Sequence, residues 1–358
     1  MLPPMIELLP VTGDWLSVAV ERLRGGGLVA FPTETVYGLG ADAADPAAVA
    51  SVYRLKGRPS DHPLIVHLPA AAAVWSWADA SAQARSGLAP DAVDALAGSL
   101  WPGPLTLVLW AAPSVPRAVT GGQDTVALRV PGNDTALALL TAFGRGVVAP
   151  SANRFGRVSP TQPTHVVDEF EDADGDVLVL EGGATDHGVE SSVIDLTSAT
   201  PRLLRPGALA VADIESVLGM AVERPGWRQG RETAPPGAAT TTTRAPGTLA
   251  QHYAPATPLR LASAAHLTAR PRGSAVIARF ADPAETSPEG SREEAGPGAT
   301  APWIRLPADP AGFAHGLYAA IRHLDAAGAD LILVEEPPTG DEWLAVRDRL
   351  MRAAAAHR

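Results

Sequence analysis

The chain has 358 residues, which is long enough for two domains. Its composition, with 46% hydrophobic and 19% charged residues, is that of a globular protein. The absence of cysteine excludes a disulfide framework and thiolate metal sites. The formal net charge of −11 argues against strong non-specific binding to nucleic acid, so a site for a polyanion has to be a local basic pocket.

We expect neither a signal peptide nor a membrane span. The first residues, MLPPMIELLP, lack a basic region followed by an apolar core. The longest apolar runs, such as PLTLVLWAA, are far shorter than the roughly 20 residues that cross a bilayer. Together with the missing cysteines, these features predict a cytoplasmic protein.

The first part of the chain predicts helices and strands in mixed order. Residues 14–24 form an amphipathic helix, LVAF at 28–31 is a buried strand, and a second helix runs from an aspartate N-cap at 45 to Gly57. A strand is expected at 63–68, and the segment that follows it, up to about residue 100, is alanine-rich and helical. Further strands are expected at 104–111, 125–130, 147–152, 176–183, 191–196 and 201–209, and helices at 135–144 and 164–170. This order predicts an α/β domain with a mixed sheet.

The composition changes between about 224 and 258, where proline, glycine and threonine dominate without periodicity. We therefore expect a catalytic domain at 10–210, a linker at 211–258 and a small α/β domain at 259–358. The last domain predicts strands at 258–263, 273–280, 301–307 and 330–336, with helices at 311–328 and 343–355. Between its second and third strands, 281–302 has the composition of a disordered loop.

One residue type is almost missing. Lys56 is the only lysine, and Ala, Gly, Pro and Arg dominate as GC-rich coding would produce. Under that bias a surface lysine becomes arginine at little cost, whereas a compact ammonium used as a point charge does not tolerate the planar guanidinium. A functional role for Lys56 is therefore favoured over a chance survival. Asparagine is nearly as rare, and Asn153 lies in the apolar-flanked APSAN.

Several familiar motifs are absent or out of context. Residues 37–43, YGLGADA, mimic a dinucleotide fingerprint, but a proline breaks the preceding strand and the next helix begins too late. No phosphate loop, nucleophile elbow or HExxH motif occurs.

The candidate stretches are polar segments at the ends of expected strands, where open α/β sheets bind ligands. FPTETVYG brings Thr33, Glu34 and Thr35; the others are LKGRP, APSAN and GVESS, with arginines in TVALRVP and LLRPG. Each has an ordinary explanation as a turn, an edge hydroxyl or a snorkelling cation. Taken together, cations, hydroxyls and an asparagine suit a triphosphate held by side chains from separate loops.

These stretches resemble one family. FPTETVYGLGADA, YRLKGRPSDHPLIVHL, LWPGPLTLVL, DTVALRVP, VVAPSANRFGRVSPT, GVESSVIDL, LLRPGA and APGTLAQHYAP, in this order, are similar to the motifs of the threonylcarbamoyl-AMP synthases. The resemblance covers roughly 10–355 and is dense up to about 258. It implies a YrdC-like open twisted mixed sheet, a linker, and a small Rossmann-like parallel α/β domain.

The resemblance implies the condensation of L-threonine, bicarbonate or carbon dioxide, and ATP to L-threonylcarbamoyl-adenylate and pyrophosphate, with Mg²⁺ accompanying the ATP. A partner enzyme would then transfer the threonylcarbamoyl group to the adenosine next to the anticodon of tRNA. Direct tRNA binding is expected to be weak, because the chain is acidic.

The family's Lys-x-Arg and Ser-x-Asn motifs map to Lys56, Arg58, Ser151 and Asn153, which the resemblance implies as catalytic groups. The implied ATP site consists of these four with His62, Thr125, Ser159, Arg205 and Tyr253. The implied threonine site consists of Thr35, His67, Arg129, Ala149 and Ser191. We expect Arg129 to pair with the substrate carboxylate, and the linker around Tyr253 to fold over the site as a lid.

The sequence departs from the family at Gln251, His62 and Asp348, where a basic residue, asparagine and asparagine are usual. Two rival hypotheses remain. A related carbamoyl-transfer enzyme of hydrogenase maturation would need cysteine-rich zinc modules and a longer chain. An RNA-binding module is disfavoured by the net charge.

Overall fold

The computed structural model describes residues 6–173, 175–224, 244–247, 252–282 and 302–357. The chain forms two compact units. Unit 1 comprises Met1–Phe155, Pro160–Asp186 and Glu190–Thr248, and unit 2 comprises Gly156–Ser159, His187–Val189 and Leu249–Arg358. Two short segments that are flanked in the sequence by unit 1 thus belong to unit 2.

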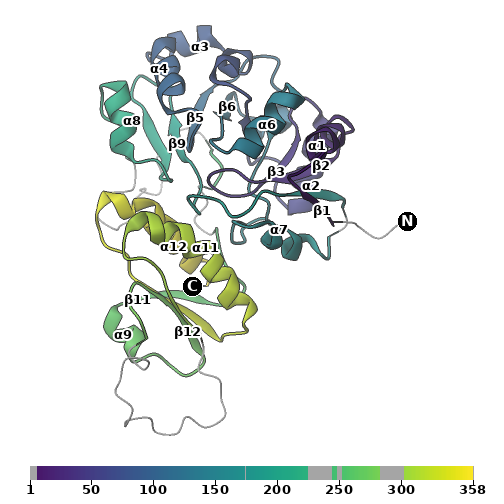
Figure 1. Ribbon diagram of the computed structural model, residues 1–358. Coiled ribbons are helices and arrows are strands. Elements are labelled where there is room, and N and C mark those ends of the chain that lie inside the picture. Colours follow the sequence, from purple (N-terminus) through teal and green to yellow (C-terminus); the bar gives the residue numbers. More distant parts are fainter. Residues whose placement is uncertain (1–5, 174, 225–243, 248–251, 283–301, 358) are drawn as a thin grey trace, which may run out of the picture. The chain divides into compact units, whose positions relative to one another are not determined.

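Unit 1 is an α/β unit (Figure 1). Its strands are β1 (Ile6–Pro10), β2 (Leu28–Phe31), β3 (Gly38–Asp42), β4 (Ile65–His67), β5 (Leu105–Trp110), β6 (Thr125–Arg129), β7 (Val147–Val148), β8 (Val177–Glu181), β9 (Ser192–Asp195) and β10 (Arg202–Arg205). Its helices are α1 (Trp15–Arg24), α2 (Pro46–Lys56), η1 (Ala71–Ser76), α3 (Ala80–Arg85), α4 (Pro90–Leu100), α5 (Arg117–Thr120), α6 (Asp134–Phe143), α7 (Pro163–Phe170) and α8 (Val211–Leu218). Helix α8 lies inside the range that the sequence assigned to the linker.

The strands of unit 1 form one sheet in the order β1-β8-β2-β3-β7-β4-β6-β5-β9-β10. The pairs β1–β8, β2–β8, β4–β6 and β5–β9 are parallel, and the other neighbours are antiparallel. The predicted mixed sheet is therefore confirmed. Its central strands β4, β6 and β7 bring together polar residues from distant parts of the sequence.

Two strands were not predicted. β1 is an edge strand with a largely exposed pattern, so it lacks the apolar run of a buried strand. β3 contains the two glycines of YGLGADA and is fully buried between β2 and β7. The dinucleotide motif was correctly rejected, but the segment that mimics it is a strand paired with β2 and β7, and close neighbours explain why it contains glycine. A Cβ on Gly40 would lie 2.7 Å from Cε1 of Phe31 and 2.9 Å from the carbonyl oxygen of Val29.

A cluster of buried apolar side chains holds α1 and α6 against the sheet. It includes Leu23 of α1, Leu139 and Phe143 of α6, and Phe31 and Leu178 of the strands, all at most 3% exposed. The two helices lie side by side in Figure 1. Because these helix faces are apolar and buried, the polar groups that could bind ligands are those of the loops at the strand ends.

Unit 2 contains a parallel four-stranded sheet in the order β11-β14-β12-β13, as predicted. Its elements are β11 (Leu259–Ala262), α9 (Ala264–Thr268), β12 (Ser274–Ala278), β13 (Trp303–Arg305), α11 (Pro310–Ala326), β14 (Leu331–Glu335), η2 (Asp341–Trp343) and α12 (Leu344–Ala355). Helices α11 and α12 pack against each other and on the sheet (Figure 1). Most of the expected loop at 281–302 lies outside the described residues.

Gly40→Ala should destabilise unit 1 by about 1–3 kcal/mol, because the added methyl overpacks a buried strand. Thermal unfolding should show a midpoint several degrees lower than that of the unchanged chain. Gly98→Ala is the matched control, since a Cβ on this glycine of α4 meets nothing within 4 Å and alanine is the better helix former. Equal midpoints for the two variants would show that β3 has room to adapt.

Candidate functional site

Lys56 is the last residue of α2 and is 3% exposed. Its ammonium donates hydrogen bonds to two backbone carbonyls in the loop after β7, those of Ser151 at 2.6 Å and of Asn153. Gly57, with a left-handed φ of 62°, ends the helix directly after the lysine. The Lys-x-Arg and Ser-x-Asn motifs, which lie 95 residues apart in the sequence, therefore meet through this cation.

The charge of Lys56 is set by its surroundings. Burial lowers the pKa of Lys56 well below its usual value, and the neighbouring positive charge of Arg58 lowers it further. The carboxylate of Glu169 acts in the opposite direction. The two carbonyl acceptors also favour the ammonium, which has three N–H donors.

The loop after β7 is held by further hydrogen bonds. Nδ2 of Asn153 donates to the carbonyl of Arg154 at 2.7 Å, and the N–H of Phe155 donates to the carbonyl of Lys56 at 2.7 Å. The N–H of Arg154 donates to Oε1 of Glu169, in α7, at 3.0 Å. Glu169 was not predicted from the sequence, because an acid on a short amphipathic helix is normally a solvated residue.

Arg58 and His62 lie close together after α2, where Nε of Arg58 donates to the carbonyl of His62 at 3.4 Å. Nη2 of Arg58 donates to the carbonyl of Pro63 at 2.9 Å, and the guanidinium carbon lies 5.6 Å from the centre of the Phe155 ring. His62 meets the same ring edge-on, with the ring centres 5.3 Å apart. Burial and then Arg58 lower the pKa of His62, so a neutral imidazole is favoured beside this cation.

The loop after β2, residues 33–36, is organised by Thr33. Its hydroxyl lies 2.8 Å from that of Thr35, donates to the carbonyl of Val36 at 2.7 Å, and accepts the N–H groups of both residues. Oγ1 of Thr35 in turn accepts a hydrogen bond from Nη2 of Arg129 at 2.9 Å. Thr33 thus has the turn role that its ordinary reading implied, and Thr35 faces the predicted arginine.

Arg129 has a protein carboxylate beside it. Its Nη2 lies 2.8 Å from Oε1 of Glu34, and the two side chains are 4% and 5% exposed. The contact is an ion pair without a well-directed hydrogen bond at the carboxylate. Nε of Arg129 donates to the carbonyl of Gly103 at 3.3 Å. Glu34 was seen in the motif but was not predicted as a site residue.

His67 lies next to Arg129 on the sheet, since the two residues are register partners of β4 and β6. Its ring meets that of Phe31 edge-on at 6.3 Å, and it is 2% exposed. The N–H of Ala149 donates to the carbonyl of Ile65 at 3.1 Å, which brings the start of the loop after β7 to the same strand. Burial, and then Arg129, lower the pKa of His67 to about 3, so the imidazole is neutral at physiological pH.

Ser191 and Arg205 form a second buried group. Nη2 of Arg205 donates to both the carbonyl and the hydroxyl of Ser191, at 2.9 and 3.0 Å, and Nε donates to the same carbonyl at 3.1 Å. The hydroxyl of Ser191 also lies 2.8 Å from that of Thr106, a polar residue inside the apolar strand β5. Nη1 of Arg205 donates to the carbonyl of Pro246 at 3.0 Å, so this arginine also holds a described part of the linker. Thr125 is 9% exposed at the start of β6.

Ser159 and Tyr253 belong to unit 2. Tyr253 is 1% exposed and has a left-handed φ of 62°. Its ring lies 4.1 Å from that of His252, 5.9 Å from that of Tyr318, and 5.0 Å from the guanidinium carbon of Arg349. The central part of the predicted lid, including Gln251, lies outside the described residues.

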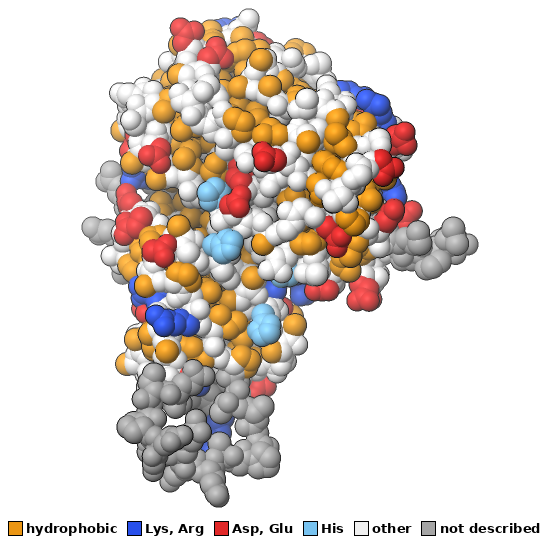
Figure 2. Space-filling model, viewed as in Figure 1, with side chains coloured by type: hydrophobic (Ala, Val, Ile, Leu, Met, Phe, Trp, Pro, Cys, Tyr) orange, Lys and Arg blue, Asp and Glu red, His pale blue; other side chains and the backbone are white. Residues whose placement is uncertain are grey.

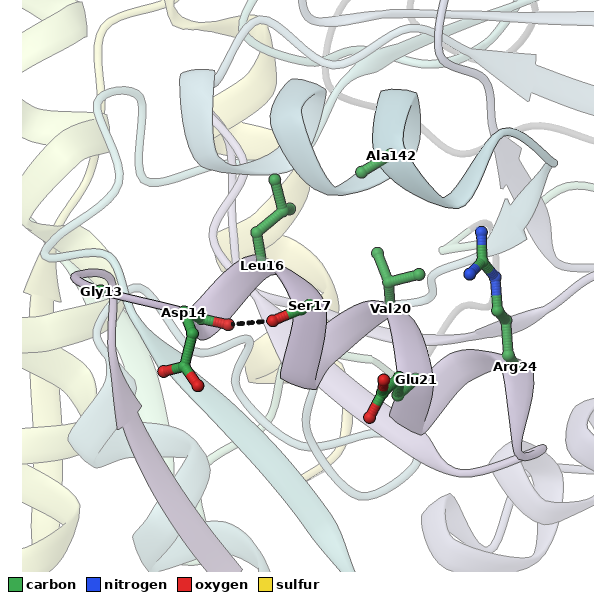
Figure 3. A pocket seen from close by; sticks show the side chains of 8 residues that line it. All are labelled: Gly13, Asp14, Leu16, Ser17, Val20, Glu21, Arg24 and Ala142. Atoms are coloured by element: carbon green, nitrogen blue, oxygen red, sulfur yellow. Dashed lines mark hydrogen bonds between the residues drawn. The ribbon is translucent and has the colours of Figure 1, made fainter.

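A surface hollow elsewhere in unit 1 contains none of these residues. It lies beside α1 and α6 and is lined by Leu16, Val20 and Ala142 with polar groups such as Asp14 and Glu21 at its rim (Figure 3). Ser17 in this hollow only caps its own helix turn, donating to the carbonyl of Asp14 at 2.8 Å. The predicted site residues therefore lie away from this hollow.

The neutral state of His67 makes the stability of unit 1 depend on pH. The unfolded imidazole has a pKa near 6.5 and the folded one a pKa of about 3, so the unfolded chain binds more protons between these values. Stability from this group is complete above pH 6.5 and falls as the pH is lowered, by at most about 1.4 kcal/mol per pH unit.

We expect His67→Gln to flatten the fall of the thermal midpoint between pH 7 and pH 5. His266→Gln, at an exposed histidine, should leave the slope as it is. Identical slopes for all three proteins would contradict a neutral buried His67.

Comparisons with known proteins agree with this geometry. The family model Sua5_yciO_yrdC, described as "Telomere recombination", matches residues 21–207, and the model "Threonylcarbamoyl-AMP synthase, C-terminal domain" matches 209–355. The threonylcarbamoyl-AMP synthase of Pyrococcus abyssi is 39% identical over 349 residues, which are 95% of this chain and 94% of the relative. That of Bacillus subtilis is 37% identical over 95% of this chain and 92% of the relative.

A solved structure agrees as well. P. abyssi Sua5 complexed with L-threonine has a TM-score of 0.80 and 34% identity, covering 99% of this chain and 98% of that chain. Both units and nearly the whole length of these relatives are matched. The chain therefore belongs to the threonylcarbamoyl-AMP synthase family.

Proposed function

We propose that the buried polar groups of unit 1 bind ATP and L-threonine and form L-threonylcarbamoyl-adenylate, the product of this enzyme family. In this reaction the threonine amine forms a carbamate, either from carbon dioxide with loss of a proton or from bicarbonate with loss of water. A carbamate oxygen then attacks the α-phosphate of ATP as pyrophosphate leaves. The observation that carries the assignment of the ATP site is the buried ammonium of Lys56, bound to the Ser151–Asn153 loop beside Arg58.

Lys56 and Arg58 supply positive charge where the triphosphate would lie. Two N–H groups of Lys56 donate to the loop carbonyls, which leaves a third donor for a phosphate oxygen. Charge that develops on phosphate oxygens is best stabilised by donors already fixed in place. The hydroxyl of Ser151 and the amide of Asn153 extend from the same loop and would orient the nucleotide.

Arg129 and His67 are suited to the threonine side. Nη2 and Nε of Arg129 are engaged by Glu34, Thr35 and Gly103, so a substrate carboxylate would be bound through Nη1, which has no bond to the described residues. This is one contact, whereas a free guanidinium can bind a carboxylate through two N–H groups. The neutral imidazole of His67 can accept or donate a hydrogen bond without adding charge.

Magnesium fits this site as a cation carried by ATP. Among the described residues, no group of three or more His, Asp or Glu side chains is arranged to hold a metal ion. Mg²⁺ commonly binds through substrate phosphates, water and few protein ligands, so the residues present suit such a mode. When bound, it would neutralise charge on the triphosphate and on the leaving pyrophosphate.

The adenylate is a mixed anhydride, and a second enzyme would transfer its threonylcarbamoyl group to tRNA. On the face shown in Figure 2, basic side chains form only small groups among acidic and apolar ones. This supports transfer by a partner protein over tight tRNA binding by this chain. No helix among the described residues is long and apolar enough to span a membrane. We place the reaction in the cytoplasm, in keeping with the absence of cysteine.

The decisive experiment measures pyrophosphate release from the purified chain with ATP, Mg²⁺ and bicarbonate, with and without L-threonine. Mass spectrometry of the same mixtures identifies the adenylate. Threonine-dependent release together with the adenylate supports the proposal. If no adenylate forms and the chain instead binds tRNA tightly, the RNA-binding alternative takes its place.

Lys56→Arg should lower kcat/KM for ATP by at least 100-fold. A guanidinium is longer and planar, so it cannot direct three donors to two loop carbonyls and one phosphate. Arg54→Lys, the reverse exchange at an exposed position of the same helix, should leave kcat/KM within about twofold. Activity retained in Lys56→Arg would identify the lone lysine as a chance survival.

Arg129→Lys should raise KM for threonine by roughly 10–100-fold, because a charge-assisted contact contributes about 1.5–3 kcal/mol. KM for ATP should change less than threefold. Arg145→Lys, at a half-exposed ion pair with Asp42, serves as the control and should leave both constants unchanged. A larger effect on ATP than on threonine would assign Arg129 to the nucleotide.

A further inference from the structure

Helix α11 of unit 2 contacts segments that do not belong to its own sheet. Unit 2 includes residues 156–159 and 187–189, and the end of the linker enters it at 252–257. In the sequence, Gly156 follows Asn153 by three residues and Val189 precedes Ser191 by two. Each segment is therefore continuous with a residue of the candidate site, or contains Ser159 or Tyr253.

Asp325, close to the end of α11, binds two of these segments at once. Its Oδ2 accepts the N–H of Ala256 at 2.9 Å and its Oδ1 accepts the N–H of Thr257 at 2.7 Å. Nη2 of Arg157 lies 3.6 Å from Oδ2. The carboxylate is 12% exposed, whereas the Arg157 side chain is 47% exposed, so the ion pair is partly open to water.

The two segments also bind each other and α11. The N–H of Ala254 donates to the carbonyl of Gly156 at 2.9 Å, and Ala254 forms a parallel bridge with Arg157. Nη2 of Arg322, one turn before Asp325, donates to the carbonyl of Val158. The loop at 156–159 and the linker end are therefore held on one face of α11.

The third segment packs on the same helix. Gly188 has a left-handed φ of 71°, and a Cβ at this position would lie 2.5 Å from the carbonyl oxygen of His315 and 2.6 Å from that of Ala314. The segment thus lies directly on the backbone of α11. One helix therefore supports all three segments.

The backbone of Tyr253 shows that the linker end is held in a conformation that non-glycine residues rarely adopt. A left-handed backbone costs a non-glycine residue about 1–2 kcal/mol and persists only where its surroundings impose it. The rings of His252 and Tyr318 and the guanidinium of Arg349 surround its side chain, and Asp325 fixes the backbone three and four residues further on.

We propose that Asp325 is a positioning residue for ATP binding, which acts by fixing the segments of Ser159 and Tyr253 through the N–H groups of Ala256 and Thr257 and through Arg157. This inference rests on the proposed function and on the nucleotide-binding role that the family resemblance implies for Ser159 and Tyr253. It assigns to Asp325 a part in substrate binding without a contact of its own to the reacting atoms.

The test uses the full chain with Asp325→Asn. Asparagine keeps an acceptor for one N–H, but its amide group faces the other N–H or Arg157 with donors. KM for ATP should rise at least tenfold, while kcat at saturating ATP and the thermal midpoint should change little. Arg157→Gln, which removes the ion pair with Asp325, should raise KM for ATP two- to threefold.

Asp282→Asn is the matched control. Asp282 is also a buried carboxylate of unit 2, and it pairs at 2.8 Å with Arg270, which belongs to none of the three segments. The two aspartate variants should therefore differ in KM for ATP. Equal values would overturn the proposal, as would a fall in kcat at unchanged KM.

A direct binding measurement separates this inference from the proposed function. Calorimetric titration with a non-hydrolysable ATP analogue should give a Kd at least tenfold higher for Asp325→Asn than for Asp282→Asn. If the unchanged chain forms no adenylate, the proposed function fails, but this comparison still decides the role of Asp325. Equal affinities would refute that role even in an active enzyme.

Discussion

The buried ammonium of Lys56 is the interaction on which the candidate nucleotide site depends. It joins the end of α2 to the loop after β7 by donating to the carbonyls of Ser151 and Asn153. A buried charge without such acceptors would carry a large desolvation cost. The same bonds therefore satisfy the lysine, fix the Ser-x-Asn loop, and leave one donor directed by the geometry of the other two.

Two arginines repeat this arrangement. Arg129 binds Thr35 and Glu34 of the loop after β2. Arg205 binds Ser191 and the carbonyl of Pro246. In each case a cation contacts oxygens of the protein itself before any ligand arrives. Such pre-arranged donors need little reorganisation when charge develops during a reaction. The acidic net charge of the chain is compatible with this design, because the cations of the candidate site are few and buried.

The elements that the sequence predicted well carry local signals. Helix α2 begins at an aspartate that caps the N–H of Ala47 at 2.8 Å and ends at a left-handed glycine, as its sequence indicated. The missed strands lack such signals. β1 is an edge strand with an exposed pattern, and β3 is rich in glycine, which is depleted in strands. Only close packing against Phe31 and Val29 explains why glycine is placed there.

The sequence by itself determined the fold class, the ends of helices with clear caps such as α2, and the short motifs that carry the candidate site residues. The tertiary structure alone decided which atoms these residues meet. Lys56 meets backbone carbonyls, Arg129 meets Glu34, and Asp325 meets N–H groups of the linker end. Backbone groups are present at almost every residue, so they leave no trace in the sequence that could identify them as partners. Contacts between segments 95 residues apart become visible only once the sheet has set the register of its strands.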